Sequence, residues 1–185
     1  CDAIRQKIEN WKEENLISDD EYYFLITSLV ESIDKYANTA SVYGAFLKKL
    51  KKTAQNNLIL KPAELIINDQ EHEAFNEDIN TVAGKIAGDI LYLDPPYNQR
   101  QYATNYHLLE TIAKYDNPEI HGKTGLREYL KEKSEYCSRT KVKKTFGDLI
   151  SKAKVKYIFL SYNNEGLMTH DDIKEIMSSR GKYGY

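Results

Sequence analysis

Apolar residues recur at helical spacing through the first part of the chain. In the first segment they fall at steps of four and three residues, at Ile4, Ile8 and Trp11. This spacing predicts a helix over residues 2–15. Ser18 and Glu21 form a capping box, and the apolar stripe after it predicts a second helix through residue 33.

The helical pattern breaks at residues 38–41 and then resumes. Tyr43, Phe46, Leu47 and Leu50 predict a third helix. Its exposed side would carry four lysines, Lys48, Lys49, Lys51 and Lys52. We therefore expect residues 1–57 to form a helical module.

After Pro62 the pattern changes to that of an α/β domain over residues 58–185. A short apolar run predicts a strand at 65–67, followed by an extended stretch at 72–78 and a short helix at 79–87. Longer apolar runs lie at residues 90–93 and 155–160. Such runs are typical of parallel strands that are covered on both faces.

Helices are predicted to separate and follow these two strands. The expected ranges are 102–113, 126–135, 146–153 and a last helix through residue 177, capped by Thr169 with Asp172. Gly181 would end the last helix near another strand. The alternation of strands and helices indicates the α/β class with a doubly wound sheet.

The first of these buried strands runs directly into Asp94, Pro95, Pro96 and Tyr97. Ligands of open α/β sheets bind beyond the carboxyl ends of the strands, so this loop is a candidate site. Its residues suit methylation of an exocyclic amine such as adenine N6, whose lone pair is delocalised into the ring. The Asp94 carboxylate and the Pro95 carbonyl can each accept one amine hydrogen, which directs the lone pair at a methyl donor. Tyr97 can stack on a base rotated out of the duplex.

The same four residues also have a structural interpretation. A strand can end in a Pro-Pro turn with an acid that caps it and a tyrosine that packs beneath it. The context favours the chemical interpretation, because the second strand ends in a polar run. This run, at Ser161, Tyr162, Asn163 and Asn164, would lie beside the same crevice.

The chain resembles the Dam-like class of N6-adenine-specific DNA methyltransferases, which includes many restriction-modification enzymes. The resemblance covers most of the chain and rests on blocks in the family's order, at residues 38–39 with 42–49, 88–98, 105–107 and 160–166. It implies a Rossmann-like methyltransferase sheet with a helical DNA-recognition insert. It also implies S-adenosyl-L-methionine as the methyl donor and double-stranded DNA as the substrate.

By this resemblance Asp94, Pro95, Pro96 and Tyr97 match the catalytic motif, and Asp94 would also contact the cofactor. Asp78 occupies the place of the acidic residue that approaches the adenine of the cofactor. An equally weighted alternative is that Asp78 caps the helix predicted at residues 79–87.

The chain departs from the family in its cofactor motifs. None of its nine glycines forms a Gly-x-Gly cluster at the start of a strand-to-helix unit. The glycine loop and the acid that binds the ribose hydroxyls would both precede residue 1, so the chain reads as an incomplete catalytic domain. The alternative to an active enzyme is a truncated or split DNA-binding remnant. Expected partners besides DNA are a cognate restriction endonuclease or a complementing methyltransferase chain.

Two basic regions are candidates for contact with DNA. In the helical module the candidates are Asn38, Thr39, Lys48, Lys49 and Lys52; after the catalytic loop they are Arg139 and Lys141. Asn105, Tyr106 and His107, on the helix after the loop, could line the pocket for the flipped base that Tyr97 stacks on. Plain alternatives are solvated lysine-rich faces for the basic regions, and packing for Asn105, Tyr106 and His107.

Charge, cysteine content and hydropathy further narrow the kind of protein and the compartment that we expect. The net charge is only -2, but residues 121–145 hold eight Lys or Arg against three Glu, so positive charge is concentrated there. Two distant cysteines predict no disulfide framework, and no apolar run is long enough for a bilayer. We therefore expect a cytoplasmic protein with no metal ligand set. Methylation of RNA or a protein amide is disfavoured, because such enzymes often carry Asn at position 94.

Overall fold

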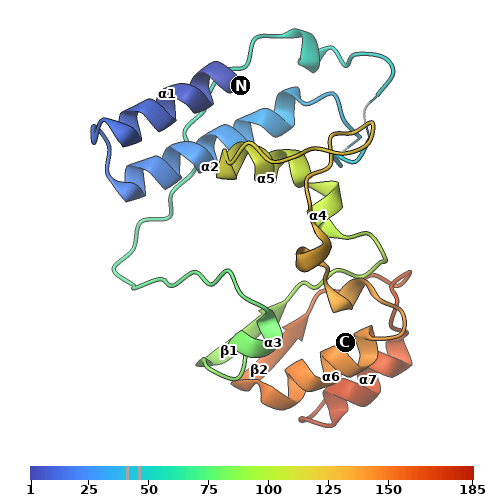
Figure 1. The fold of residues 1–185 in the computed structure, drawn as a ribbon. Helices are drawn as coiled ribbons and strands as arrows, with labels where there is room; N and C mark the ends of the chain where they lie inside the picture. Colours follow the sequence, from blue (N-terminus) through green and yellow to red (C-terminus); the bar gives the residue numbers. More distant parts are fainter. Residues whose placement is uncertain (41, 46) are drawn as a thin grey trace. The chain divides into compact units, whose positions relative to one another are not determined.

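The computed structural model describes residues 1–40, 42–45 and 47–185, which divide into two compact units (Figure 1). The first unit comprises Cys1–Asp69 and Ala103–Lys131, and the second comprises Gln70–Tyr102 and Glu132–Tyr185. Residues 103–131 thus fold with the N-terminal helices although they follow the Asp94–Tyr97 loop in sequence. The domain boundary expected near residue 57 stays a prediction.

Two helices form the frame of the first unit. They are α1 (Asp2–Glu13) and α2 (Asp19–Tyr36), and they pack side by side in Figure 1. The predicted capping box is confirmed, because the Ser18 hydroxyl accepts a hydrogen bond from the Glu21 N–H and the Glu21 carboxylate accepts one from the Ser18 N–H. Ile8, Ile26, Leu29 and Ile33 are buried between these helices, as their helical spacing predicted.

A buried arginine ties a third helix to these two. Arg5 is only 1% exposed, and its guanidinium donates to the Ile112 carbonyl at 2.8 Å and to the Ala113 carbonyl at 3.3 Å. These carbonyls lie in the last turn of α5 (His107–Lys114), where the helix dipole stabilises a positive charge. Arg5 also donates to Glu9 of α1 and to the Tyr22 hydroxyl of α2.

The third helix predicted around residues 43–50 is wrong for the residues described; Phe46 lies outside them. The Asn38 side chain organises a loop here instead, donating to the Leu47 carbonyl at 2.9 Å and accepting from the Lys51 N–H at 3.0 Å. Such side-chain bonds compete with helical hydrogen bonds for the backbone. A single turn, η1 (Thr53–Gln55), follows the loop.

The helix predicted over residues 102–113 is interrupted. It consists of α4 (Tyr102–Asn105) and α5, separated at Tyr106. Tyr43 occupies the break: its N–H donates to the Asn105 carbonyl at 2.6 Å, and its carbonyl lies 3.2 Å from His107 Nε2. The Asn105 carbonyl is therefore bonded to another segment rather than to the next helical turn.

The second unit is a two-stranded parallel sheet covered by helices on one face. The strands are β1 (Ala87–Leu93) and β2 (Lys154–Leu160), as predicted, and they pair with Leu91 beside Ile158 and Leu93 beside Leu160. These apolar residues contact the core formed with α6 (Val142–Lys152), α7 (His170–Ser178) and the short α3 (Ile79–Val82). The Thr169 cap of α7 is confirmed and includes a reciprocal bond with Asp172.

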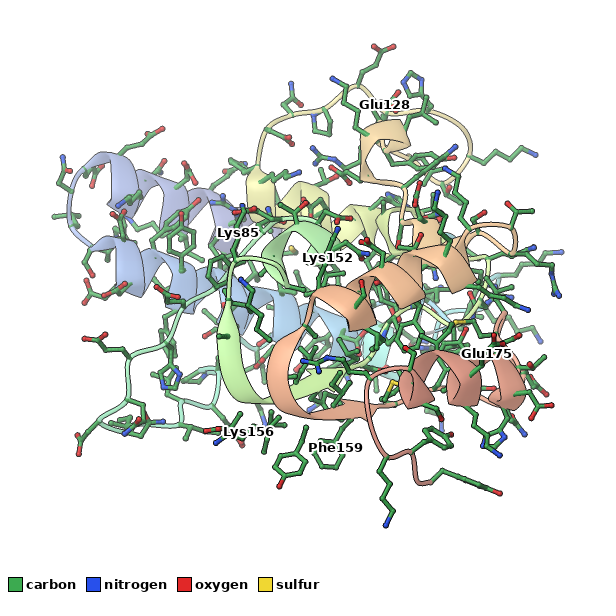
Figure 2. The ribbon with its side chains drawn as sticks, turned by 90° about the horizontal axis from the view of Figure 1, so that it is seen from below. Lys85, Glu128, Lys152, Lys156, Phe159 and Glu175 are labelled. Carbon is green, nitrogen blue, oxygen red and sulfur yellow. The ribbon has the colours of Figure 1, made fainter. Side chains whose placement is uncertain are left out.

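The opposite face of this sheet is exposed, so the expectation that both strands are covered on both faces is wrong for this chain. Alternate residues point to opposite faces, and the register pairs Ile90 with Tyr157 and Tyr92 with Phe159 on the open face. All four are more than half exposed. Figure 2 shows Phe159 on the side of the strands away from α6.

Other predicted elements are shorter or absent in the described residues. Residues 65–67 form no strand, and Ile66 and Ile67 are each 91% exposed, because no neighbouring strand pairs with them. The only helical structure in residues 126–135 is the single turn η2 (Leu130–Glu132) and the start of η3 (Glu135–Cys137), and no strand follows Gly181. The fold is thus mixed α/β. None of the described helices is long and apolar enough to cross a bilayer.

Candidate active site

The Asp94–Tyr97 loop begins where the sheet core ends. Leu93 is 6% exposed and its carbonyl accepts the last sheet hydrogen bond, from the Ser161 N–H at 2.8 Å. The next residue, Asp94, is exposed, whereas Pro95 and Pro96 are half-buried. The end of β1 therefore presents a carboxylate to solvent on a backbone that the two prolines restrict.

The loop after β2 is joined to this loop by a backbone hydrogen bond. The Leu167 N–H donates to the Tyr97 carbonyl at 2.8 Å. The Tyr162 hydroxyl accepts a bond from the Met168 N–H at 3.2 Å, and Met168 is buried. The polar segment after β2 and the Asp94–Tyr97 loop thus lie at the same edge of the sheet, as expected from parallel strands.

A glycine makes the close packing of the second loop possible. A Cβ at Gly166 would lie 2.3 Å from Tyr162 Cε1 and 2.9 Å from the Asn163 carbonyl oxygen. The Asn163 side chain accepts a bond from the Glu165 N–H at 2.7 Å, which tightens the turn. Only glycine leaves room here for the Tyr162 ring, in the same loop whose Leu167 N–H donates to the Tyr97 carbonyl.

The site loop presents two side chains with complementary chemistry. Asp94 is exposed and accepts hydrogen bonds, and the Tyr97 ring is 38% exposed. Between them Pro95 offers a carbonyl. An acceptor pair with an adjacent aromatic face can bind an amine on a planar heterocycle.

The segment after the loop is fastened to residues 134–137. The Gln101 side-chain amide donates to the Ser134 carbonyl at 3.2 Å and accepts from the Ser134 N–H at 2.8 Å. The Cys137 thiol donates to the Arg100 carbonyl at 3.3 Å, and burial raises the pKa of this thiol, so it keeps its proton. Sequence reasoning missed these residues, because neither periodicity nor a motif marks a side chain that bonds a distant backbone.

The chain is similar to known proteins along nearly its whole length. The family model described as D12 class N6 adenine-specific DNA methyltransferase matches residues 1–176. The chain belongs to this D12 class. The family expected from the sequence blocks is therefore confirmed.

Several relatives of the D12 chain are named as methyltransferases. It is 54% identical to the type II methyltransferase M.NlaIII of Neisseria lactamica, and the match covers 98% of this chain and 54% of that relative. It is 46% identical to the type II methyltransferase M.FokI of Planomicrobium okeanokoites, over 97% of this chain and 28% of the relative. It is 43% identical to the modification methylase StsI of Streptococcus sanguinis, and this match covers 95% of this chain and 27% of the relative. The chain thus spans about half the length of M.NlaIII. No solved structure matches it.

Asp78 of the D12 chain caps α3. Its Oδ1 accepts from the Asn80 N–H at 3.0 Å and from the Thr81 N–H at 3.3 Å, so the capping interpretation is confirmed. The residue also lines a pocket of about 450 Å³. The other lining residues are Asn80, Glu135, Thr140, Lys141, Lys144, Thr145 and Asp148. A role in cofactor binding stays a prediction.

A hydrogen-bond network forms one wall of this pocket. The Asn80 side chain donates to the Asp148 carboxylate and accepts from the Tyr136 hydroxyl, both at 2.8 Å. Lys152 and then Asn80 lower the pKa of Asp148, while burial raises the pKa of Tyr136, so the wall keeps an anionic carboxylate and a neutral phenol. No local sequence pattern marks this network, since its members are far apart in sequence.

The residues proposed for DNA contact fall in both units. In the first unit Lys48, Lys49 and Lys52 are exposed and have no carboxylate partner among the residues described. The side-chain amide of Asn38 is used within its loop, and Thr39 and Asn105 are half-buried. In the second unit Arg139 is exposed and Lys141 pairs with Glu135 at 2.8 Å. His107 is 2% exposed, in agreement with packing rather than base contact.

Proposed function

We propose that this chain carries the catalytic loop of a site-specific DNA adenine-N6 methyltransferase. The observation that supports the proposal is the exposed Asp94 with Tyr97 at the carboxyl edge of a parallel sheet, in a chain of the D12 class. Double-stranded DNA is the proposed substrate. The two strands would belong to a larger Rossmann-like sheet.

In this mechanism the protein prepares the amine for attack. The Asp94 carboxylate and the Pro95 carbonyl accept the two N6 hydrogens of a flipped adenine, which localises the nitrogen lone pair. The Tyr97 ring stacks on the base and replaces the stacking lost from the duplex. The contact between Tyr97 and Leu167 keeps the loop in place for this task.

S-adenosyl-L-methionine would supply the methyl group. The pocket beside Asp78 suits its adenosine end, because both cap bonds are accepted on Oδ1 and Oδ2 is left to accept from an adenine amine. Asp94 would lie near the reacting end. The described glycines provide no Gly-x-Gly cradle for the methionine end, so we propose that this part of the site needs residues outside the chain.

DNA would be held by exposed basic side chains. Lys48, Lys49 and Lys52 lie in the loop organised by Asn38, and phosphate contact by exposed lysines lends affinity without sequence preference. Arg139 would contact the target strand near the catalytic loop. Lys141 would have to exchange Glu135 for phosphate, so we expect a smaller contribution from it.

The second candidate is a non-catalytic, DNA-binding part of such an enzyme. The observation that favours it is that none of the nine glycines forms a Gly-x-Gly cradle. Methylation would then require a complementing methyltransferase chain as a partner. A cognate restriction endonuclease would act on the same DNA site.

Isothermal titration of the chain with S-adenosyl-L-methionine separates the two candidates. The titration is run with and without a duplex that contains unmethylated adenines, followed by a radiolabelled methyl-transfer assay on DNA, RNA and protein substrates. Cofactor binding with transfer to DNA supports the enzyme. DNA binding without cofactor binding supports the non-catalytic part.

A further inference from the structure

Two arginines of the second unit, Arg100 and Arg139, differ in their contacts from the other three arginines of the chain. Arg5 is buried with four hydrogen bonds, Arg127 forms a two-point ion pair with Asp116, and Arg180 donates to the Ala153 carbonyl. Arg100 and Arg139 are exposed, and neither guanidinium has a hydrogen-bond or ion-pair partner among the described residues. These two charges are therefore available to an anion.

The backbone bonds beside these arginines bring them together. The Cys137 thiol donates to the Arg100 carbonyl, and Arg139 follows Cys137 by two residues. Two hydrogen bonds between Gln101 and Ser134 hold the same two segments together, one residue after Arg100 and three residues before Cys137. The Asn98 side chain also accepts from the Arg100 N–H at 2.9 Å. The two guanidiniums thus extend from adjacent, restrained backbone.

Their location indicates which anion they would meet. Arg100 follows Tyr97 by three residues, a length of chain that spans at most about 10 Å. In a flipped nucleotide, the phosphates on either side are the anions nearest to the base. Arginine presents several N–H donors in a planar fork that matches phosphate oxygens.

We propose that Arg100, together with Arg139, binds a backbone phosphate that flanks the adenine to be methylated. This inference rests on the proposed function. The pair positions the target strand beside Tyr97, while the lysine-rich loop of the first unit holds DNA without reference to the target base. Lys156, labelled in Figure 2, is a suitable control, because it is exposed on β2 and pairs with Asp89.

The test is the salt dependence of duplex binding, measured by fluorescence anisotropy for the wild-type chain, Arg100→Gln, Arg100→Lys and Lys156→Gln. We expect Arg100→Gln to weaken binding by about tenfold and to reduce the slope of log K against log salt by about 1. Arg100→Lys should restore the slope and only part of the affinity. Lys156→Gln should match wild type, and circular dichroism checks that all variants fold.

A neutral methylphosphonate placed at each phosphate next to the target adenine locates the contact. At one of the two positions it should weaken wild-type binding as much as Arg100→Gln does, and it should add little further loss in that variant. Full additivity at both positions, or an unchanged slope for Arg100→Gln, would overturn the inference. If wild type transfers methyl groups while Arg100→Gln binds normally, the proposed function stands without this contact. If the wild-type chain binds no DNA, the proposed function and this inference are both wrong.

Discussion

The Leu167 N–H donates to the Tyr97 carbonyl at 2.8 Å, so the loop after β2 supports the candidate catalytic loop after β1. This bond makes the second loop part of the site although it carries no proposed catalytic group. The backbone of Tyr97 is thus bonded to the loop of residues 161–168, where Gly166 and Tyr162 are packed against each other. Changes there should therefore reach the chemistry without touching the substrate.

Substitutions of Asp94 and of Tyr97 should have different effects on methyl transfer and DNA binding. In the complete enzyme, we expect Asp94→Ala to abolish methyl transfer and to spare most DNA binding, because the carboxylate acts on the amine rather than on phosphate. Tyr97→Ala should lower both the rate and the affinity for a duplex whose target adenine is unpaired, since stacking contributes about 1–3 kcal/mol per base. Single-turnover methylation and anisotropy measure the two effects. Near-normal methylation by Asp94→Ala would end the proposed mechanism.

Gly166→Ala should destabilise the second unit and weaken catalysis. The added methyl group would lie 2.3 Å from the Tyr162 ring, so the ring must move away from the Met168 N–H. Overpacking of this kind costs about 1–3 kcal/mol of unfolding free energy, which urea denaturation measures. Gly147→Ala is the matched control: nothing lies within 4 Å of a Cβ there, and alanine in α6 should be neutral or stabilising. Equal stability of the two variants would contradict the assigned packing.

The parts of this fold that could be predicted from sequence are those with local signals. The two capped helices have Ser18 and Thr169 at their starts, and β1 and β2 are apolar runs of strand length. The Asp94–Tyr97 loop was also evident from sequence, because it directly follows such a run. Each of these features is encoded within a few residues.

The predictions from sequence were wrong where hydrogen bonds between residues far apart in sequence determine the backbone conformation. The Asn38 side chain replaces a predicted helix with a loop, and Tyr43 interrupts a predicted helix at Asn105. The Gln101–Ser134 pair joins segments 33 residues apart. No periodicity in a single sequence reports such partners. The open face of the sheet was missed for a related reason, since an apolar strand shows what it could bury but not what covers it.

The stability of the second unit should fall at acid pH through Asp172. Its bond with Lys143, followed by the Thr169 cap bonds, lowers the pKa of Asp172 from 3.8 to about 2. A depressed folded pKa contributes stability that is present above the unfolded pKa and is lost as pH falls from about 4 to 2. Asp172→Asn should therefore lower stability at neutral pH and reduce the loss across this window. Thermal unfolding between pH 2 and 7 measures both, with exposed Asp171→Asn as the control.

The two faces of the β1–β2 sheet should respond differently to truncation. Leu149 of α6 is 1% exposed against the covered face, so Leu149→Ala should cost about 2–5 kcal/mol of unfolding free energy. Phe159 is 55% exposed on the open face, and Phe159→Ala should cost much less. Because exposed aromatic groups promote association, the Phe159 variant should also remain monomeric to a higher concentration in sedimentation velocity. A large loss of stability for Phe159→Ala in monomeric protein would show that this face is covered within the chain itself.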